Sequence, residues 1–113
     1  MTINEKALAL HKEWNGKLDV TPKCQVKSRN DLAIAYTPGV AEPCKVIAKD
    51  KKEAYHYTIK ANTIAVISDG SAVLGLGNIG AEAAMPVMEG KAVLFREFGG
   101  VNAFPICLDT QDT

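Results

Sequence analysis

Tyr36 and Lys91 are the side chains of this 113-residue chain whose surroundings suggest acid–base chemistry. An apolar run ends at Tyr36, and Thr37-Pro38-Gly39 follows at once. The proline keeps Thr37 extended and lacks a backbone donor, and the glycine permits a sharp turn. We therefore expect a buried strand over residues 32–36. Its end would present the Tyr36 phenol beside a tight loop, where ligands bind in open α/β sheets.

Lys91 lies within an apolar stripe of a second segment. Val87, Lys91, Leu94 and Phe98 follow one another at spacings of four, three and four residues, which predicts one face of a helix. A lysine in such a stripe either extends its amino group to water or is buried. Burial lowers the pKa of a lysine and makes it a usable base near neutral pH. From the residues alone, a surface lysine and a buried base both stay open.

Residues 75–80, with the sequence GLGNIG, have the GxGxxG spacing of a dinucleotide-binding turn. Such a turn needs an acidic residue about 20 positions further on to bind the ribose. The next predicted strand ends at Asp109, which is too far along, and residues 99–105 contain no acid. We therefore favour close backbone packing at a strand-to-helix turn over NAD binding.

The remaining pattern predicts the elements that position these residues. Thr2 and Glu5 fit a capping box that begins a helix, and Gly16 ends it. The stripe of this helix suits either a seam between helices or cover for the domain's own core; it comprises Ile3, Ala7, Leu10 and Trp14. Strands are expected over residues 19–21, 63–67, 72–76 and 103–108, and helices from residue 42 and over residues 81–98.

Composition favours one globular domain. The chain is 47% hydrophobic and 23% charged, and 13 basic residues balance 13 acidic ones. This balance gives no long-range attraction to nucleic acid or to an anionic membrane. No apolar run approaches the roughly 20 residues of a membrane span, and the start lacks the order of a signal peptide. We therefore expect a cytoplasmic protein.

The cysteines and histidines predict neither a disulfide framework nor a metal site within this chain. Cys24, Cys44 and Cys107 are far apart and form no CxxC pair, so reduced, partly buried thiols are expected. His11 and His56 stand in no ligand pattern. We therefore expect no metal ligands here.

Four segments, in order, resemble the amino-terminal domain of malic enzymes, most of all the small bacterial type. They read SRNDLAIAYTPGVAEPC, ISDGSAVLGLGNIG, MPVMEGKAVLF and FGGVNAFPICLDT, and the resemblance extends from about Lys17 to Thr110. It implies an α/β fold: a small three-layer domain with a mostly parallel sheet flanked by helices. Residues 1–113 would form the substrate-binding and catalytic amino-terminal domain. The nucleotide-binding domain would be absent, as in a truncated chain.

The resemblance also implies a reaction, the oxidative decarboxylation of malate to pyruvate and CO2 with NAD or NADP and Mg2+ or Mn2+. Lys91 would be the general base that takes the proton of the C2 hydroxyl, and Tyr36 the general acid that protonates C3 of the enolate. In the family, the metal ligands and the nicotinamide-binding domain lie further downstream. We therefore expect no cofactor-binding or metal-binding residues in this chain, and no activity from it alone.

One departure from the family concerns substrate binding. Larger malic enzymes carry an arginine at the position of Ala72, where it binds a substrate carboxylate. Asn78 and the amides of the glycine run are the candidates to replace it. A malolactic enzyme of the same family and a non-catalytic dimerisation or interaction module remain alternatives. A homodimer through the amino-terminal helix is expected.

Overall fold

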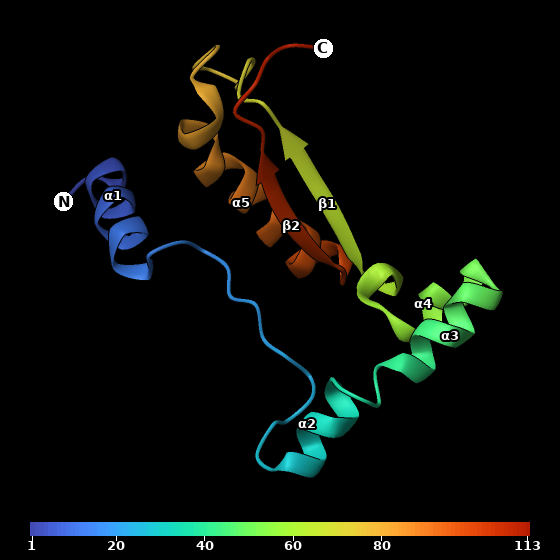
Figure 1. Ribbon diagram of the computed structural model, residues 1–113. Coiled ribbons are helices and arrows are strands. Elements are labelled where there is room, and N and C mark those ends of the chain that lie inside the picture. Colours follow the sequence, from blue (N-terminus) through green and yellow to red (C-terminus); the bar gives the residue numbers. More distant parts are fainter. The chain divides into compact units, whose positions relative to one another are not determined.

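The computed structural model describes residues 1–113, which divide into two compact units. Unit 1 comprises Met1–Asp19 and Thr63–Thr113, and unit 2 comprises Val20–Asn62. Figure 1 labels the helices and strands along the chain. None of its helices combines the length and the apolar character that crossing a membrane requires.

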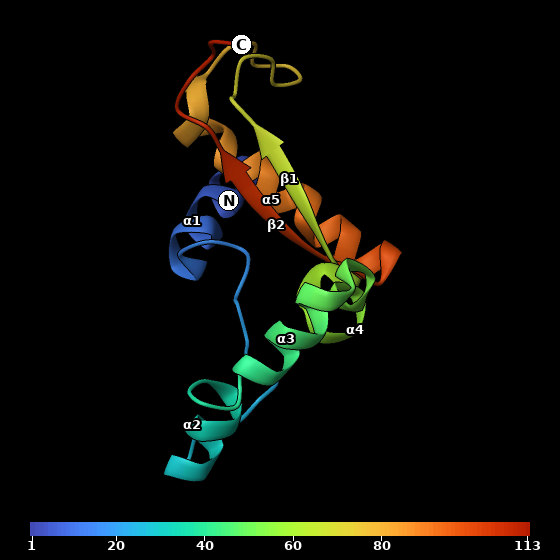
Figure 2. The same ribbon diagram turned by 45° about the vertical axis from the view of Figure 1, so that its right-hand side comes forward.

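Unit 1 is built on a parallel pair of strands joined by one long helix. Strand β1 (Thr63–Ser68) is followed by helix α5 (Gly80–Gly99) and by strand β2 (Asn102–Cys107). The register pairs Thr63 with Asn102 at one end and Ser68 with Cys107 at the other. Figures 1 and 2 show α5 running along one side of both strands. The predicted strands at 63–67 and 103–108, the helix at 81–98 and the α/β class are confirmed.

The core of unit 1 is the face of α5 that packs against β1 and β2. Its buried side chains are mostly small and recur every three or four residues, and Val73 joins them; those on the helix are Ala81, Ala84, Met88 and Ala92. Small residues let the helix approach the strands closely. The stripe that carries Lys91 lies on another face of α5 and is exposed, with Phe98 85% exposed. The small residues of α5 therefore pack on the strands, while the apolar stripe that contains Lys91 stays at the surface.

Gly70 fixes the beginning of α5. Its carbonyl accepts hydrogen bonds from the amides of Ile79 (3.0 Å) and Gly80 (3.2 Å). The φ of Gly70 is +73°, and a Cβ at this position would lie 2.0 Å from the carbonyl oxygen of Gly80. Only glycine fits this turn, because any side chain would collide with the backbone of the first helical turn.

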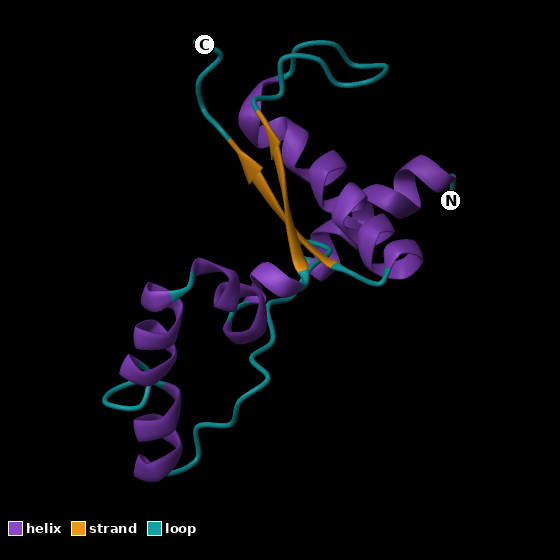
Figure 3. Cartoon of the chain, turned by 90° about the vertical axis from the view of Figure 1, so that its right-hand side faces the viewer, coloured by secondary structure: helices purple, strands orange, loops and turns teal.

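Residues 72–76 form a turn, so the strand predicted there is wrong. Val73 and Gly77 exchange two backbone hydrogen bonds, of 2.7 and 2.8 Å, in an isolated antiparallel bridge. Positive φ angles at Gly75 and Gly77 reverse the chain within five residues, which is too short for a paired strand. Figure 3 shows the resulting long loop between β1 and α5.

Helix α1 (Ile3–Trp14) confirms the amino-terminal capping prediction, because Thr2 Oγ1 accepts a hydrogen bond from the amide of Glu5 at 3.1 Å. Asn15 adopts the left-handed conformation at the other end, and Gly16 follows with a φ of +102°. None of the residues of α1 is buried, and Ile3 is 86% exposed. The apolar stripe of α1 therefore contributes little to the core of unit 1.

Unit 2 contains helices and loops but no strand (Figure 3). Its helices are α2 (Arg29–Ala35), α3 (Ala41–Lys49) and α4 (Ala54–Tyr57), with short 3-10 turns η1 (Lys51–Glu53) and η2 (Ile59–Ala61). The helix predicted from residue 42 is confirmed as α3. Residues 19–21, predicted as a short strand, join no sheet.

The predicted strand at residues 32–36 is wrong, because these residues belong mostly to α2. Ser28 Oγ accepts from the amide of Asp31 at 3.1 Å, and the carboxylate of Asp31 accepts from the amide of Lys27 at 3.0 Å. This capping arrangement starts a helix. A five-residue apolar run does not distinguish helix from strand, and it is not buried here, since Ile34 is 68% exposed.

The turn at Gly70 gives a stability prediction. Gly70→Ala should lower the free energy of unfolding by roughly 2–4 kcal/mol, from left-handed strain and from the collision with Gly80. Gly90→Ala is the matched control, because a Cβ at Gly90 meets no atom within 4 Å. Inside a helix it should raise the free energy by about 0.5–1 kcal/mol. Urea unfolding measures both, and equal midpoints for Gly70→Ala and the wild type would contradict the packing described.

Candidate functional site

Tyr36 lies at the carboxyl end of α2 in unit 2. Its amide donates to the carbonyl of Leu32 at 2.8 Å, and its carbonyl accepts from the amide of Val40 at 2.7 Å. The amide of Gly39 donates to Ala33 at 2.8 Å, so the loop after Tyr36 folds back onto the end of the helix. The backbone of Tyr36 is thus fixed from both sides while its side chain is 65% exposed. The phenol is therefore exposed at the end of a helix, whereas the prediction placed it at the end of a strand.

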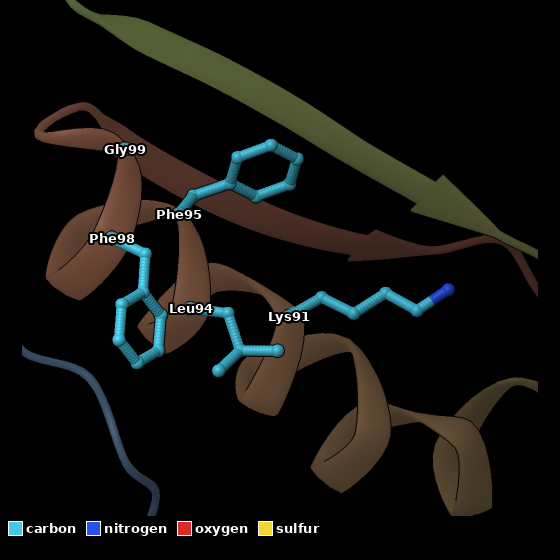
Figure 4. A pocket seen from close by; sticks show the side chains of 5 residues that line it. All are labelled: Lys91, Leu94, Phe95, Phe98 and Gly99. Atoms are coloured by element: carbon cyan, nitrogen blue, oxygen red, sulfur yellow. The ribbon is translucent and has the colours of Figure 1, made fainter.

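Lys91 lies in the middle of α5 in unit 1 and is exposed. Figure 4 shows its side chain extended, with the amino nitrogen pointing in the direction of the arrowheads, which are the carboxyl ends of β1 and β2. Long helical side chains lean toward the amino terminus of their helix, and α5 begins at that edge of the sheet. The fold therefore directs the amine toward the edge where parallel α/β sheets bind ligands.

An open apolar hollow of about 430 Å³ lies beside Lys91. It is lined by Lys91, Leu94, Phe95, Phe98 and Gly99, all from α5 (Figure 4). The stem of the lysine forms one wall, and aromatic and aliphatic side chains form the others. Of the two states left open for Lys91, this chain shows the exposed one, because the apolar neighbours of Lys91 stand on the same helix and leave the amine facing water. Covering this hollow would remove water from around the amine.

Asn78 is paired with Gln111, which the sequence did not indicate as a functional residue. Asn78 Nδ2 donates to Gln111 Oε1 at 3.0 Å, and Gln111 Nε2 donates to Asn78 Oδ1 at 2.8 Å. The pair joins the loop before α5 to the segment that follows β2. The signal that could have found Gln111 is its position, because the segments that follow two paired parallel strands meet at one edge of the sheet.

Most amides of the glycine run are already engaged. Those of Leu76 and Gly77 donate to the carbonyl of Val73, and those of Ile79 and Gly80 donate to Gly70. A dinucleotide-binding turn needs free amides at the amino terminus of the helix for the pyrophosphate. The run therefore does not fit a nicotinamide cofactor.

The prediction that the glycines of this run allow close backbone packing is wrong. A Cβ at Gly75, Gly77 or Gly80 would meet no atom within 4 Å. Each of the three has a positive φ, which is what the loop requires of them. The close backbone approach occurs at Gly70 instead.

The acidic groups of the chain do not assemble a metal site. No group of three or more His, Cys, Asp or Glu residues stands close enough together to hold a metal ion. Cys24 and Cys44 are exposed, Cys107 is half-buried, and all three are free thiols. Asp69, which directly follows β1, accepts hydrogen bonds from the hydroxyl and the amide of Ser71, and these lower the pKa of its carboxyl group. The donor set of this chain therefore does not fit a divalent cation.

Two of the three predicted site residues, Lys91 and Asn78, lie in unit 1 and are separated by most of the first half of α5. Lys91 stands eleven positions along the helix from Gly80, the first residue of α5. At 1.5 Å per residue this is about 16 Å, longer than one lysine side chain. Tyr36 belongs to unit 2 and is described within that unit. Ala72 is exposed in the loop after β1.

The sequence of this chain is similar to those of known proteins. The family model "Malic enzyme, N-terminal domain" matches residues 15–113. The chain is 60% identical over 112 residues to a bifunctional malic/malolactic enzyme of Bacillus subtilis, covering 99% of this chain and 27% of that protein. It is 58% identical over 113 residues to an NAD-dependent malic enzyme of Geobacillus stearothermophilus, covering 100% of this chain and 23% of that protein. Relatives from further bacteria are named NADP-dependent malic enzymes.

The fold of this chain is also similar to that of a solved structure. The crystal structure of malic enzyme from Pyrococcus horikoshii superposes with a TM-score of 0.93 at 59% sequence identity, over 98% of this chain and 26% of that one. The chain thus spans about a quarter of the length of these relatives.

The engaged amides of the glycine run give a binding prediction. The 113-residue chain should show no heat of NAD binding by calorimetry, because the amides of Ile79 and Gly80 already donate to the carbonyl of Gly70. Inorganic pyrophosphate serves as the control ligand for nonspecific phosphate binding. Saturable NAD binding in the low-micromolar range would show that the run is a nucleotide site after all.

Proposed function

Because this chain belongs to the malic enzyme N-terminal domain family, we propose that the complete protein oxidatively decarboxylates malate to pyruvate and CO2. The observation that carries the proposal is the match of the family model to residues 15–113, a segment that contains both Tyr36 and Lys91. Residues 1–113 are proposed to be the substrate-binding and catalytic amino-terminal domain. The proposed cofactors are NAD or NADP and Mg2+ or Mn2+, supported by relatives named NAD-dependent or NADP-dependent malic enzymes. Residues outside this chain would hold them.

Lys91 is proposed as the general base, its Nζ accepting the proton of the C2 hydroxyl of malate. Only a neutral amine can accept a proton, and apolar surroundings favour the neutral form of a lysine once water is excluded. The hollow formed by Leu94, Phe95 and Phe98 beside its stem supplies such surroundings when substrate or protein covers it. A positioned base contributes roughly 10²–10⁴-fold to a reaction rate.

Tyr36 is proposed as the general acid, its hydroxyl donating a proton to C3 of the enolate to release pyruvate. A phenol has an ordinary pKa near 10 and is therefore protonated at neutral pH. It can donate to a carbanion-like carbon but is a poor base for an alcohol. The fixed backbone and the exposed ring of Tyr36 support this role, because they hold the donor in place without burying it.

Substrate carboxylates need other partners where the family's arginine is replaced by Ala72. Asn78 is proposed as one of them. Its pairing with Gln111 uses one N–H and one lone pair of its amide group and leaves one N–H to donate. Within the glycine run, the amides of Gly75 and Asn78 are the ones that donate to no other group.

A malolactic activity is the second candidate, because one of the relatives is named a bifunctional malic/malolactic enzyme. Such an enzyme converts malate to lactate without releasing reduced cofactor. Assaying the complete protein for both products distinguishes the two: pyruvate with stoichiometric reduced nicotinamide supports the malic activity, and lactate without it supports the alternative.

Two further proposals concern assembly and location. A homodimer through α1 would cover exposed apolar residues such as Ile3 and Leu8. Sedimentation of the complete protein tests it, and a monomer at micromolar concentration would exclude it.

A cytoplasmic location is proposed because the three cysteines are free thiols, as in reducing compartments. Fractionation of the source cells tests this location.

The base assignment gives a kinetic prediction for the complete protein. Lys91→Ala should lower kcat by about a hundredfold or more with the fold intact. Lys91→Arg should fail nearly as badly, because a guanidinium keeps its proton. Lys49→Ala, an exposed lysine at the end of α3, is the control and should leave kcat unchanged. If Lys91→Arg retained most of the activity, the base would be another group.

The acid assignment separates protonation from binding. Tyr36→Phe removes the hydroxyl and keeps the ring, so the thermal midpoint should change little. Malate affinity should stay within about a few-fold, oxaloacetate should still be reduced, and pyruvate formation should fall about a hundredfold. Tyr55→Phe, on α4, is the control. Pyruvate formation at the wild-type rate would refute the acid role, and complete loss of malate binding would make Tyr36 a substrate ligand instead.

A further inference from the structure

Gly39 joins the end of α2 to the beginning of α3 within unit 2. Its amide donates to the carbonyl of Ala33 at 2.8 Å, in the last turn of α2. Its carbonyl accepts from the amide of Glu42 at 3.1 Å, in the first turn of α3. Because both polar groups of its backbone are bonded, the position of Gly39 is fixed relative to both helix ends.

A side chain does not fit at Gly39. A Cβ there would lie 2.6 Å from the carbonyl oxygen of Ala33, 2.7 Å from that of Ile34 and 3.0 Å from the Cα of Ile34. These are backbone atoms of α2, which cannot turn aside as the end of a flexible side chain can. Gly39 is not among the glycines with a positive φ, so its backbone conformation alone does not call for glycine. The residue is required here by the space beside α2.

A collision at Gly39 would be transmitted to Tyr36. Tyr36 lies three residues after Ala33 and three before Gly39, and its carbonyl accepts from the amide of Val40 at 2.7 Å. Pro38, between Tyr36 and Gly39, has a fixed φ and also restricts the residue before it, so the loop has little freedom to absorb a shift. Moving Gly39 away from α2 therefore moves the backbone of Tyr36, and the phenol moves with it.

We propose that Gly39 is a positioning residue for Tyr36, because its close contact with α2 holds the phenol where it can donate a proton to C3 of the enolate. The role rests on the proposed function, in which Tyr36 is the general acid. Proton transfer needs the donor within hydrogen-bond distance of the acceptor, and a misplacement of about 1 Å can lower a rate about a hundredfold. Gly39 acts in this role only through the position of Tyr36.

The two fates of added oxaloacetate test this role in the complete protein, with metal and cofactor supplied. Gly39→Ala should lower its conversion to pyruvate on the order of tenfold or more, while its reduction and the KM for malate stay within about a few-fold. A loss of folded protein would lower both rates together. Gly90→Ala is the matched control and should leave the conversion to pyruvate unchanged, because it adds the same methyl group where no atom lies within 4 Å.

A double variant shows whether the two residues act together. Tyr36→Phe already removes the hydroxyl, so adding Gly39→Ala to it should slow pyruvate formation no further. The positioning role is overturned if Gly39→Ala forms pyruvate at the wild-type rate, or if it causes the same loss with and without the hydroxyl. Pyruvate formation at the wild-type rate by Tyr36→Phe would instead refute the acid assignment of the proposed function, so the two failures are distinguishable.

The wild type alone gives a test that needs no variant to fold. Hydrogen exchange of the Gly39 and Val40 amides should be about as slow as that of the Tyr36 amide, because all three are bonded to carbonyls of α2 or of its last residue. Exchange of the Gly39 amide at the rate of an open loop would exclude the contact with α2, and the role of Gly39 with it.

Discussion

The close contact between one face of α5 and the β1–β2 pair is the interaction on which unit 1 depends. Two parallel strands cannot be joined by a tight turn, so the chain must cross over and return, and α5 is that crossing. Ala81, Ala84 and Ala92 keep the helix close to the strands, and the missing side chain of Gly70 lets the loop after β1 touch the first helical turn. The direction of α5 then follows, with its amino terminus at the carboxyl ends of both strands.

That direction decides what the other faces of α5 can do. A helix that buries a narrow face of small residues leaves its larger apolar side chains outside, and Leu94, Phe95 and Phe98 accordingly line an open hollow with Lys91. The lysine leans toward the start of the helix, as long helical side chains do, and so toward the edge where Asn78 pairs with Gln111. Chemistry in this unit is therefore possible on the side of α5 that packing does not use.

Helix α1 and the region of Tyr36 are held differently, by polar contacts more than by buried area. The ammonium of Lys17 and the carboxylate of Glu89 connect α1 with α5, while capping by Ser28 and the folded-back loop at Gly39 fix the ends of α2. Such contacts are directional and contribute on the order of 1 kcal/mol each. They fix the positions of individual side chains and helix ends, whereas the packing of α5 on β1 and β2 fixes a whole element.

The sequence alone determined the elements whose patterns are long or chemically distinct. The β-branched run at 63–67, the 20-residue helix α5, the Thr2 cap and the presence of Tyr36 and Lys91 within family segments were all readable from the residues. It did not determine the secondary structure of short segments, because the five apolar residues at 32–36 fit a strand as well as a helix. In the structure, the cap from Ser28 to Asp31 starts a helix there.

The glycine run likewise matched a nucleotide fingerprint by spacing. Only the tertiary structure, by placing the Gly70 carbonyl on the Ile79 and Gly80 amides, decided that these donors are engaged. The exposure of Lys91 and the pairing of Asn78 with Gln111 were also decided there. The pairing depends on two segments that are distant along the chain and meet at one edge of the sheet.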